Sequence, residues 1–89
     1  MRRVLPPLNA LRGFEAATRR QSVREAAEEL CLTHPAVSYQ IRGLEERVGV
    51  KLFERSKGRV KLTEAGRRLL VPLSEAFDRI DGAFAALRT

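Results

Sequence analysis

Residues 22–48, SVREAAEELCLTHPAVSYQIRGLEERV, decide the fold because they encode two short amphipathic helices joined by a tight turn. Ser22 and Glu25 have the spacing of a capping box, in which the hydroxyl accepts from the Glu25 amide and the carboxylate reaches the Ser22 amide. Ala26 and Ala27 lie in mid-helix, where small side chains let another helix cross closely. The stretch predicts a helix-turn-helix with its turn near residues 31–33.

The helix after the turn has an apolar face and a polar face. Thr33 suits the N-cap and Pro35 suits the first turn. The apolar stripe that should face the core is Val37, Ile41, Leu44 and Val48. On the opposite face, acids occur only at Glu45 and Glu46, toward the C-terminal end. Because phosphate repels acids, we expect the N-terminal half to enter a DNA groove and the C-terminal half to leave it.

Five residues of this segment are candidates for contacts with DNA on their position alone: His34, Pro35, Ser38, Tyr39 and Arg42. Ser38 can bond to a base edge, and Tyr39 can hydrogen-bond or contact a thymine methyl. Pro35 offers a similar apolar contact, while Arg42 would reach a guanine or, more readily, a phosphate. A solvated helix surface is the alternative for any single residue, but such a surface would carry more lysine and glutamate.

A basic hairpin should follow the third helix. After Gly49, a common residue at a helix end, the alternation around a glycine-containing turn predicts β-strands within residues 51–62. Residues 51–68 hold seven basic and two acidic side chains, and therefore most of the excess positive charge. A hairpin beside a recognition helix is a wing, whose tip can reach phosphates or a minor groove. Arg55 is the first candidate, followed by Lys57 and Arg59, for which a solvated turn is the alternative.

The last helix should begin at Thr63 as its N-cap. Apolar residues on it alternate by three and four, as in a heptad seam: Leu70, Leu73, Phe77, Ile80, Phe84 and Leu87. One helix cannot bury so many large side chains alone, so we expect pairing with a second copy. Pro72 lacks an amide, which predicts a kink or a helix that is regular only beyond it.

The chain before residue 22 predicts a loose basic arm and one helix. Pro6 and Pro7 exclude a helix interior from residues 1–7. Apolar spacing then predicts a helix over residues 8–20 that packs behind the other two.

The bulk composition limits the class of protein. Eighty-nine residues, 44% of them hydrophobic, suit one small domain. A net charge of +6 favours a polyanionic partner, with a basic protein that has no nucleic-acid role as the alternative. No apolar run is long enough to cross a membrane, so a cytosolic protein with no membrane partner is expected. The one cysteine, Cys31, excludes an internal disulfide, and we expect it to be a small buried side chain.

Four motifs together resemble the N-terminal domain of LysR-type transcriptional regulators. They are S-x-x-x-A-A-x-x-L from Ser22, T-H-P-A-V-S-x-Q-I-x-x-L-E-x-x-x-G from Thr33, L-F-x-R from Leu52 and L-T-x-A-G from Leu62. The resemblance runs from about Leu8 to the end of the chain. The opening L-P-P-L-N-A-L-R-x-F-E-A-A and the later P-L-S-E-A-F-D-R-I-D-G look closest to the branch of activators of β-lactamase and glycine-cleavage genes.

The resemblance implies a mainly α winged helix-turn-helix over residues 8–65, with its helix-turn-helix at 23–42, and a linker helix over 66–89. It implies a bacterial, nucleoid-associated regulator that dimerises by antiparallel pairing of linker helices, forms dimers or tetramers, and binds partly palindromic promoter DNA. In the family, the positions of Thr33, His34, Pro35, Ser38 and Tyr39 meet the major groove, and the wing arginine, here Arg55, meets the minor groove. His34 is often glutamine there and Tyr39 often histidine or arginine, so base preference is not carried over.

Family members continue into a C-terminal domain that binds a small-molecule effector. The resemblance therefore implies that these residues are either the isolated DNA-binding part or a natural fragment. A non-specific architectural DNA binder is the main alternative, but it would carry lysine and arginine on the recognition face. The sequence does not suggest an enzyme. It has one histidine and no Cys-His or Ser-His-Asp set, no metal-ligand cluster and no phosphate-binding glycine loop. No catalytic residue, cofactor or metal is therefore expected.

Overall fold

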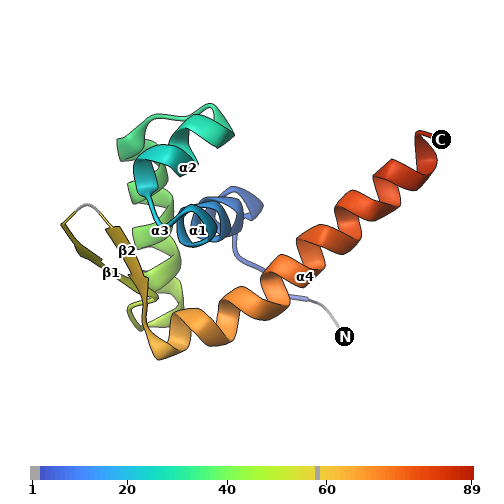
Figure 1. Ribbon diagram of the computed structural model, residues 1–89. Coiled ribbons are helices and arrows are strands. Elements are labelled where there is room, and N and C mark those ends of the chain that lie inside the picture. The colour runs from blue at the N-terminus through green and yellow to red at the C-terminus, as the bar shows by residue number, and fades with distance from the viewer. Residues whose placement is uncertain (1–2, 58) are drawn as a thin grey trace.

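The computed structural model describes residues 3–57 and 59–89. The elements, in chain order, are α1 (Leu8–Arg20), α2 (Val23–Leu30), α3 (His34–Val48), β1 (Phe53–Ser56), β2 (Arg59–Leu62) and α4 (Glu64–Leu87). In Figure 1 the first three helices cross one another, the hairpin lies beside α3, and α4 projects away from this body. The predicted mainly α winged helix-turn-helix with a long last helix is confirmed.

The core lies where α2 and α3 cross α1. Its largest fully buried side chains are Phe14, Ile41, Leu44 and Val37. Ala26 and Ala27 of α2 are buried as well, so small side chains do occur at the predicted helix crossing. Leu52, Phe53 and Val60 extend the core under the hairpin. Removal of these apolar groups from water is what holds the short helices together.

The predicted helix caps are present, with one exception. Ser22 Oγ accepts from the Glu25 amide at 3.1 Å, and Thr33 Oγ1 accepts from the Ala36 amide at 3.2 Å. The Ser22 amide, however, donates to the Ala17 carbonyl at 3.1 Å. The second half of the predicted capping box is therefore wrong, because that amide already closes the end of α1. The Glu25 carboxylate lies 3.7 Å from Arg20 instead.

Two residues are more exposed than predicted. Cys31 ends α2 in the left-handed conformation, with φ 59°, and lies exposed in the turn rather than buried. Val48 was assigned to the core stripe, but it is about half exposed. Leu52, from the loop that follows α3, is buried in the core.

The hairpin is anchored at its base and along one edge. Strands β1 and β2 pair antiparallel, with Arg55 opposite Val60. Glu45 Oε2 accepts from the Leu52 amide at 2.9 Å, and the Val60 amide donates to the Gln21 carbonyl at 3.3 Å. The chain reverses direction after Gly49, and the backbone amides of Leu52 and Phe53 then donate to the Glu45 carboxylate. Glu45 is therefore not a solvent-facing acid at the C-terminal end of α3. Gly58, the glycine of the predicted turn, lies outside the described residues.

Helix α4 begins at the predicted N-cap, where Thr63 Oγ1 accepts from the Gly66 amide at 3.1 Å. It is continuous through Pro72, so the predicted irregularity is limited to the gentle curve visible in Figure 1. The six seam residues separate into two groups. Leu70, Leu73 and Phe77 pack partly against the core of their own chain. The exposed fractions of Ile80, Phe84 and Leu87 are 51%, 59% and 80%.

Candidate nucleic-acid interface

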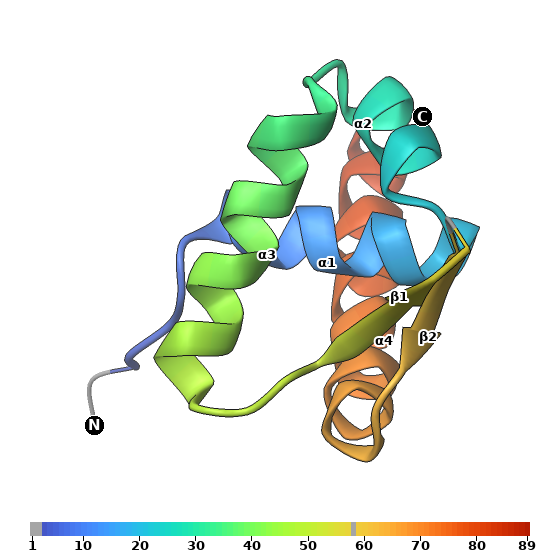
Figure 2. The same cartoon turned by 90° about the vertical axis from the view of Figure 1, so that its left-hand side faces the viewer.

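One face of the molecule presents α3 and the hairpin side by side, as Figure 2 shows. Thr33, His34, Pro35, Tyr39 and Arg42 are all exposed, and Tyr39 is 70% exposed. Pro35, Tyr39 and Arg42 lie on the side of α3 opposite to Val37 and Ile41, which pack in the core, whereas the other two lie at the start of the helix. Five of the six candidates of this segment are therefore accessible to a large ligand.

Ser38 is the sixth, and the structure places it differently. It is only 5% exposed, although its spacing put it at the edge of the outer face. Its Oγ accepts from Arg55 Nη2 at 2.6 Å. The Arg55 guanidinium also lies 5.7 Å from the centroid of the Phe53 ring. Ser38 and Phe53 thus hold the wing arginine against the flank of α3, and a guanidinium with five N–H groups keeps donors for a further acceptor.

A cationic groove lies between the starts of α2 and α3 and the wing. His34, Arg55 and Arg59 line it, together with Arg24 and one acid, Glu25, of α2. Three arginines around one concave surface suit phosphate, because each can present two parallel N–H donors to an anion. Arg24 was missed by sequence reasoning. In the sequence, Arg24 appears only as a basic residue two positions after the Ser22 cap. The hairpin that completes the groove lies far away in the sequence.

A second groove separates the middle of α3 from the base of the wing. Arg42, Lys51 and Arg55 line it with Glu45. Lys57 is exposed at the tip of the hairpin in the left-handed conformation, with φ 53°. The structure therefore brings Arg42, Arg55 and Arg59 to the two sides of the wing and leaves Lys57 at its outer end.

The segment before α1 is less loose than predicted. Residues 3–7 form no helix, but the Leu5 carbonyl accepts from Arg47 Nη2 of α3 at 3.4 Å. Pro7 also lines a groove together with Tyr39 and Arg42 of α3. Residues 3–7 thus lie next to the recognition helix, while residues 1–2 of the predicted arm lie outside the described residues.

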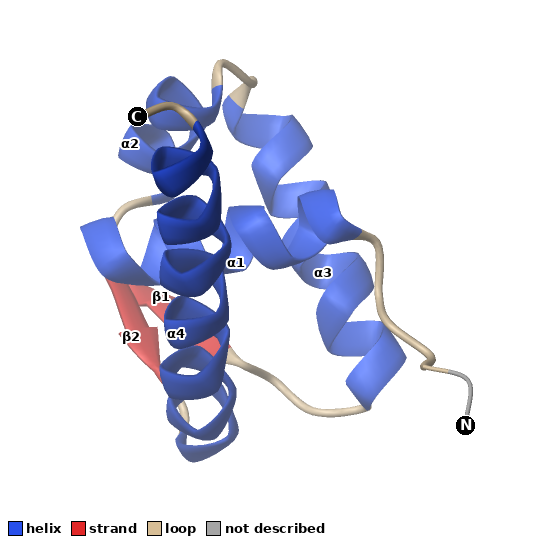
Figure 3. Cartoon of the chain, turned by 90° about the vertical axis from the view of Figure 1, so that its right-hand side faces the viewer, coloured by secondary structure: helices blue, strands red, loops and turns tan. Residues whose placement is uncertain are grey.

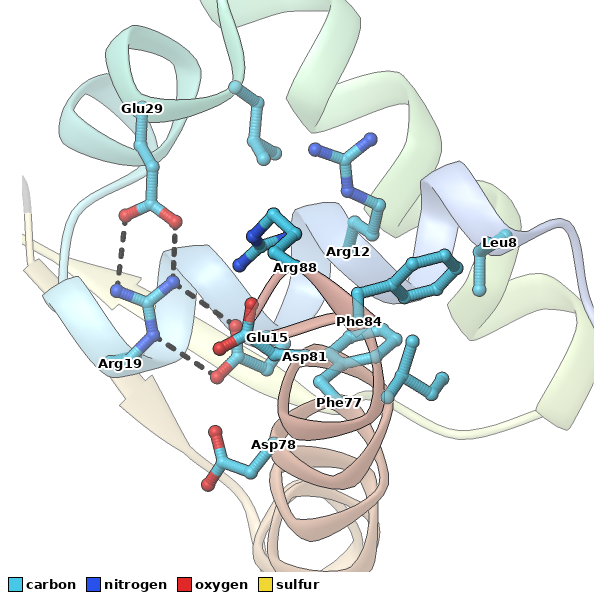
Figure 4. Close-up of a pocket in the computed structure, with 12 residues that line it drawn as sticks. Leu8, Arg12, Glu15, Arg19, Glu29, Phe77, Asp78, Asp81, Phe84 and Arg88 are labelled. Carbon is cyan, nitrogen blue, oxygen red and sulfur yellow. Dashed lines mark hydrogen bonds and ion pairs between the residues drawn. The ribbon is translucent and has the colours of Figure 1, made fainter. Parts of the chain in front are cut away.

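An ion-pair cluster fixes α1 to α2 on the side facing α4 (Figure 4). Arg19 Nη2 lies 2.6 Å from Glu29, Arg20 Nε lies 2.7 Å from the same carboxylate, and Arg19 Nε lies 3.1 Å from Glu15. Hydrogen bonds from Arg19 and then Arg20 lower the pKa of Glu29 to about 2. Hydrogen bonds from Glu29 and Glu15 raise the pKa of Arg19. The Glu29 carboxylate therefore stays charged at neutral pH, and its ion pairs with Arg19 and Arg20 join α2 to α1.

The described residues contain neither a metal-binding cluster nor a membrane-spanning helix. Within residues 3–57 and 59–89, no group of three or more His, Cys, Asp or Glu side chains could hold a metal ion. None of the helices described is long and apolar enough to cross a membrane.

Comparison with known proteins identifies the family to which this fold and surface correspond. Residues 8–67 match the model of the family described as bacterial regulatory helix-turn-helix protein, lysR family. The chain is 53% identical over 88 residues to the HTH-type transcriptional regulator TrpI of Pseudomonas aeruginosa, covering 99% of this chain and 30% of that protein. It is 46% identical over 88 residues to the glycine cleavage system transcriptional activator of Escherichia coli, covering 99% and 29%. The chain thus spans less than a third of these relatives.

Solved structures with this fold include a complex with DNA. The BenM DNA-binding domain bound to catB site 1 DNA superposes with a TM-score of 0.80 and 33% identity, covering 91% of each chain. The oxidized form of OxyR of Corynebacterium glutamicum superposes with a TM-score of 0.85 and 28% identity, covering 99% of this chain and 28% of that one.

Proposed function

This chain belongs to the lysR family of bacterial regulatory helix-turn-helix proteins, as their DNA-binding domain, and we propose that it reads a specific promoter site as a homodimer. The observation that carries the proposal is the exposed first half of α3, which is flanked by arginines on the wing. The outward face of this half of α3 is mostly polar and aromatic, with Arg42 at its far end, whereas the other cations lie on the wing and α2 beside it. This arrangement separates base reading from phosphate binding.

The first half of α3 enters the major groove. Thr33, His34, Pro35, Tyr39 and Arg42 face outward there, and the acid nearest to them in the sequence, Glu45, is bound to the amides at the wing base. Removal of that carboxylate from the outer face lowers its repulsion of phosphate. Tyr39, the one Phe, Tyr or Trp residue of α3, is 70% exposed and is the main base-reading residue.

The wing contacts the backbone and the adjacent minor groove. Arg55 is aimed by Ser38 and Phe53, so we assign Ser38 to positioning Arg55 rather than to direct base contact. Arg59 and Arg24 contact phosphate from the cationic groove, and Lys57 contacts phosphate from the tip. A narrow minor groove attracts arginine through its negative potential.

The homodimer forms through the second half of α4. Ile80, Phe84 and Leu87 are exposed apolar groups, and a second copy supplies the surface that would remove them from water. Leu70, Leu73 and Phe77, which are partly buried in their own chain, complete the seam at its other end. A small-molecule effector would act through a part of the protein beyond these 89 residues, in the cytoplasm of a bacterial cell.

Selection from random duplex DNA, followed by titration at several salt concentrations, tests the proposal. We expect a two-part site bound at least ~10³-fold more tightly than random DNA at physiological salt. Arg24→Gln should lower the slope of log affinity against log salt by about one on both DNAs, because one phosphate contact is lost. Arg79→Gln, on exposed α4, is the matched control. A preference below about tenfold, with the same steep salt dependence, would instead establish a non-specific architectural binder.

A further inference from the structure

A chain of polar contacts connects the linker helix to the helix-turn-helix. The Ser74 hydroxyl donates to Glu15 Oε2 at 3.1 Å. The same carboxylate accepts from Arg19 Nε at 3.1 Å, and Arg19 Nη2 donates to Glu29 at 2.6 Å. Among the residues described, Ser74–Glu15 is the side-chain hydrogen bond that joins α4 to the three-helix body. The contacts therefore run from α4 through α1 to α2.

Ser74 lies in the part of α4 that is attached to the core, so its hydrogen bond can affect the direction of the exposed part. Leu69, Leu70, Leu73 and Phe77 are the large residues of α4 that pack on the core, so Ser74 lies within the attached part. Beyond Phe77 the helix is largely exposed, and in Figure 3 it runs along one side of the molecule with α1 behind it. The direction of the exposed part is thus set by the attached part of α4, which runs from the first turn to Phe77 and contains Ser74.

A small rotation at Ser74 has a large effect at the end of α4. Leu87 lies thirteen residues further on, which is about 20 Å along a helix. A rotation on the order of 10° would move that end by roughly 3–4 Å, which is close to the rise of one base pair. The exposed end of the proposed dimer seam, Ile80, Phe84 and Leu87, lies in this part of α4, so the rotation would change the distance between two bound half-sites.

We propose that Ser74 is a positioning residue: by holding Glu15 it sets the direction of α4 and thereby the half-site spacing that the dimer accepts. This inference rests on the proposed dimeric DNA binding. The apolar contacts of α4 resist its separation from the core but can slide, whereas a hydrogen bond to a carboxylate that Arg19 already holds is directional. The partial burial of Ser74 and Glu15 limits competition from water.

Pulsed electron–electron distance measurements test the helix direction without DNA. Spin labels are placed at Glu28→Cys on α2 and Ala86→Cys on α4, in a Cys31→Ser background, and labelled chains are diluted with unlabelled ones. We expect Ser74→Ala to shift or broaden the distance distribution by several ångströms, while Ser74→Thr, which keeps the hydroxyl, restores it. Glu75→Gln on exposed α4 is the control. Distributions for Ser74→Ala that match those of the unsubstituted chain and the control would overturn the inference.

Competition between operators with different spacings tests the consequence. The unsubstituted chain should prefer one spacing over its one-base-pair neighbours, and Ser74→Ala should reduce that preference about three- to tenfold, the range expected for loss of one hydrogen bond. Ser74→Thr should restore it, even if Ser74→Ala also lowers stability. An unchanged preference would overturn the inference. If the unsubstituted chain itself showed no two-part site, the proposed function would fail, and the distance measurement would still decide the role of Ser74.

Discussion

Replacement of Gly66 by alanine tests how the wing is joined to α4. Gly66 is buried in the first turn of the helix. A Cβ atom there would overlap the Leu52 carbonyl oxygen and lie 2.9 Å from Leu62 Cδ2. The same Leu52 carbonyl accepts from the Thr63 amide at 3.1 Å. Neither the backbone carbonyl nor α4 can move away without opening that hydrogen bond, so the substitution should destabilise the domain.

The magnitude follows from three contributions to the free energy of unfolding. Overpacking at a well-packed site costs ~1–3 kcal/mol. Loss of the Thr63–Leu52 hydrogen bond costs ~1 kcal/mol more. The helix propensity of alanine offsets this by ~1 kcal/mol. The net loss is about 1–3 kcal/mol, which in a domain of this size lowers Tm by roughly 5–20 °C.

Thermal and urea unfolding followed by circular dichroism measure the effect at one fixed protein concentration, since a dimer's stability depends on concentration. Gly82→Ala is the matched control, because it lies in the same helix with no atom within 4 Å of the added Cβ. It should raise stability by up to ~1 kcal/mol through helix propensity alone. If Gly66→Ala were as stable as the unsubstituted chain, or gained stability as Gly82→Ala does, the described packing of the wing against α4 would be refuted.

Three further predictions address the interface, the dimer and the ion-pair cluster. Tyr39→Ala should cost ~1–3 kcal/mol on the selected site and little on random DNA in anisotropy titrations; equal losses on both would remove Tyr39 from base reading. Asp at both Ile80 and Phe84 should give monomers by analytical ultracentrifugation, because both exposed side chains belong to the proposed seam; an unchanged dimer would place the interface elsewhere. Because the folded pKa of Glu29 is depressed to about 2, its contribution is present above its ordinary pKa near 4.5 and is lost as pH falls toward 2. Glu29→Gln should therefore lower Tm at neutral pH, with the difference from the unsubstituted chain fading over that window. Glu28→Gln, at an exposed glutamate of the same helix, is the control, and a Glu29→Gln difference that did not depend on pH would contradict the ion pair's role.

Local signals in the sequence predicted most of the fold. Ser22, Thr33 and Thr63 are helix caps whose hydrogen bonds span three residues, so they could be inferred from spacing. Gly49 likewise ends α3 with φ 81°. The wing was predicted because its alternation and turn are contiguous. These features depend on neighbours along the chain, which a single sequence shows directly.

The candidate interface could be predicted in part. Exposure of Tyr39 and Arg42 followed from their angular distance from the core stripe. The burial of Ser38 could not be predicted in this way, because it depends on a contact with Arg55 of the wing, seventeen positions away in the sequence. Arg24 was missed for the same reason, since the wing that makes its groove cationic comes from another part of the chain.

The sequence by itself determined which segments are helices, where they begin, and which half of α3 is free of acids. These properties come from backbone capping, apolar periodicity and the order of charges. Only the tertiary structure decided which polar groups meet: Arg55 with Ser38, Glu45 with the amides at the wing base, and Ser74 with Glu15, fifty-nine positions apart. Those contacts depend on the angles at which the elements cross, and these angles arise from packing of the whole core rather than from any one segment.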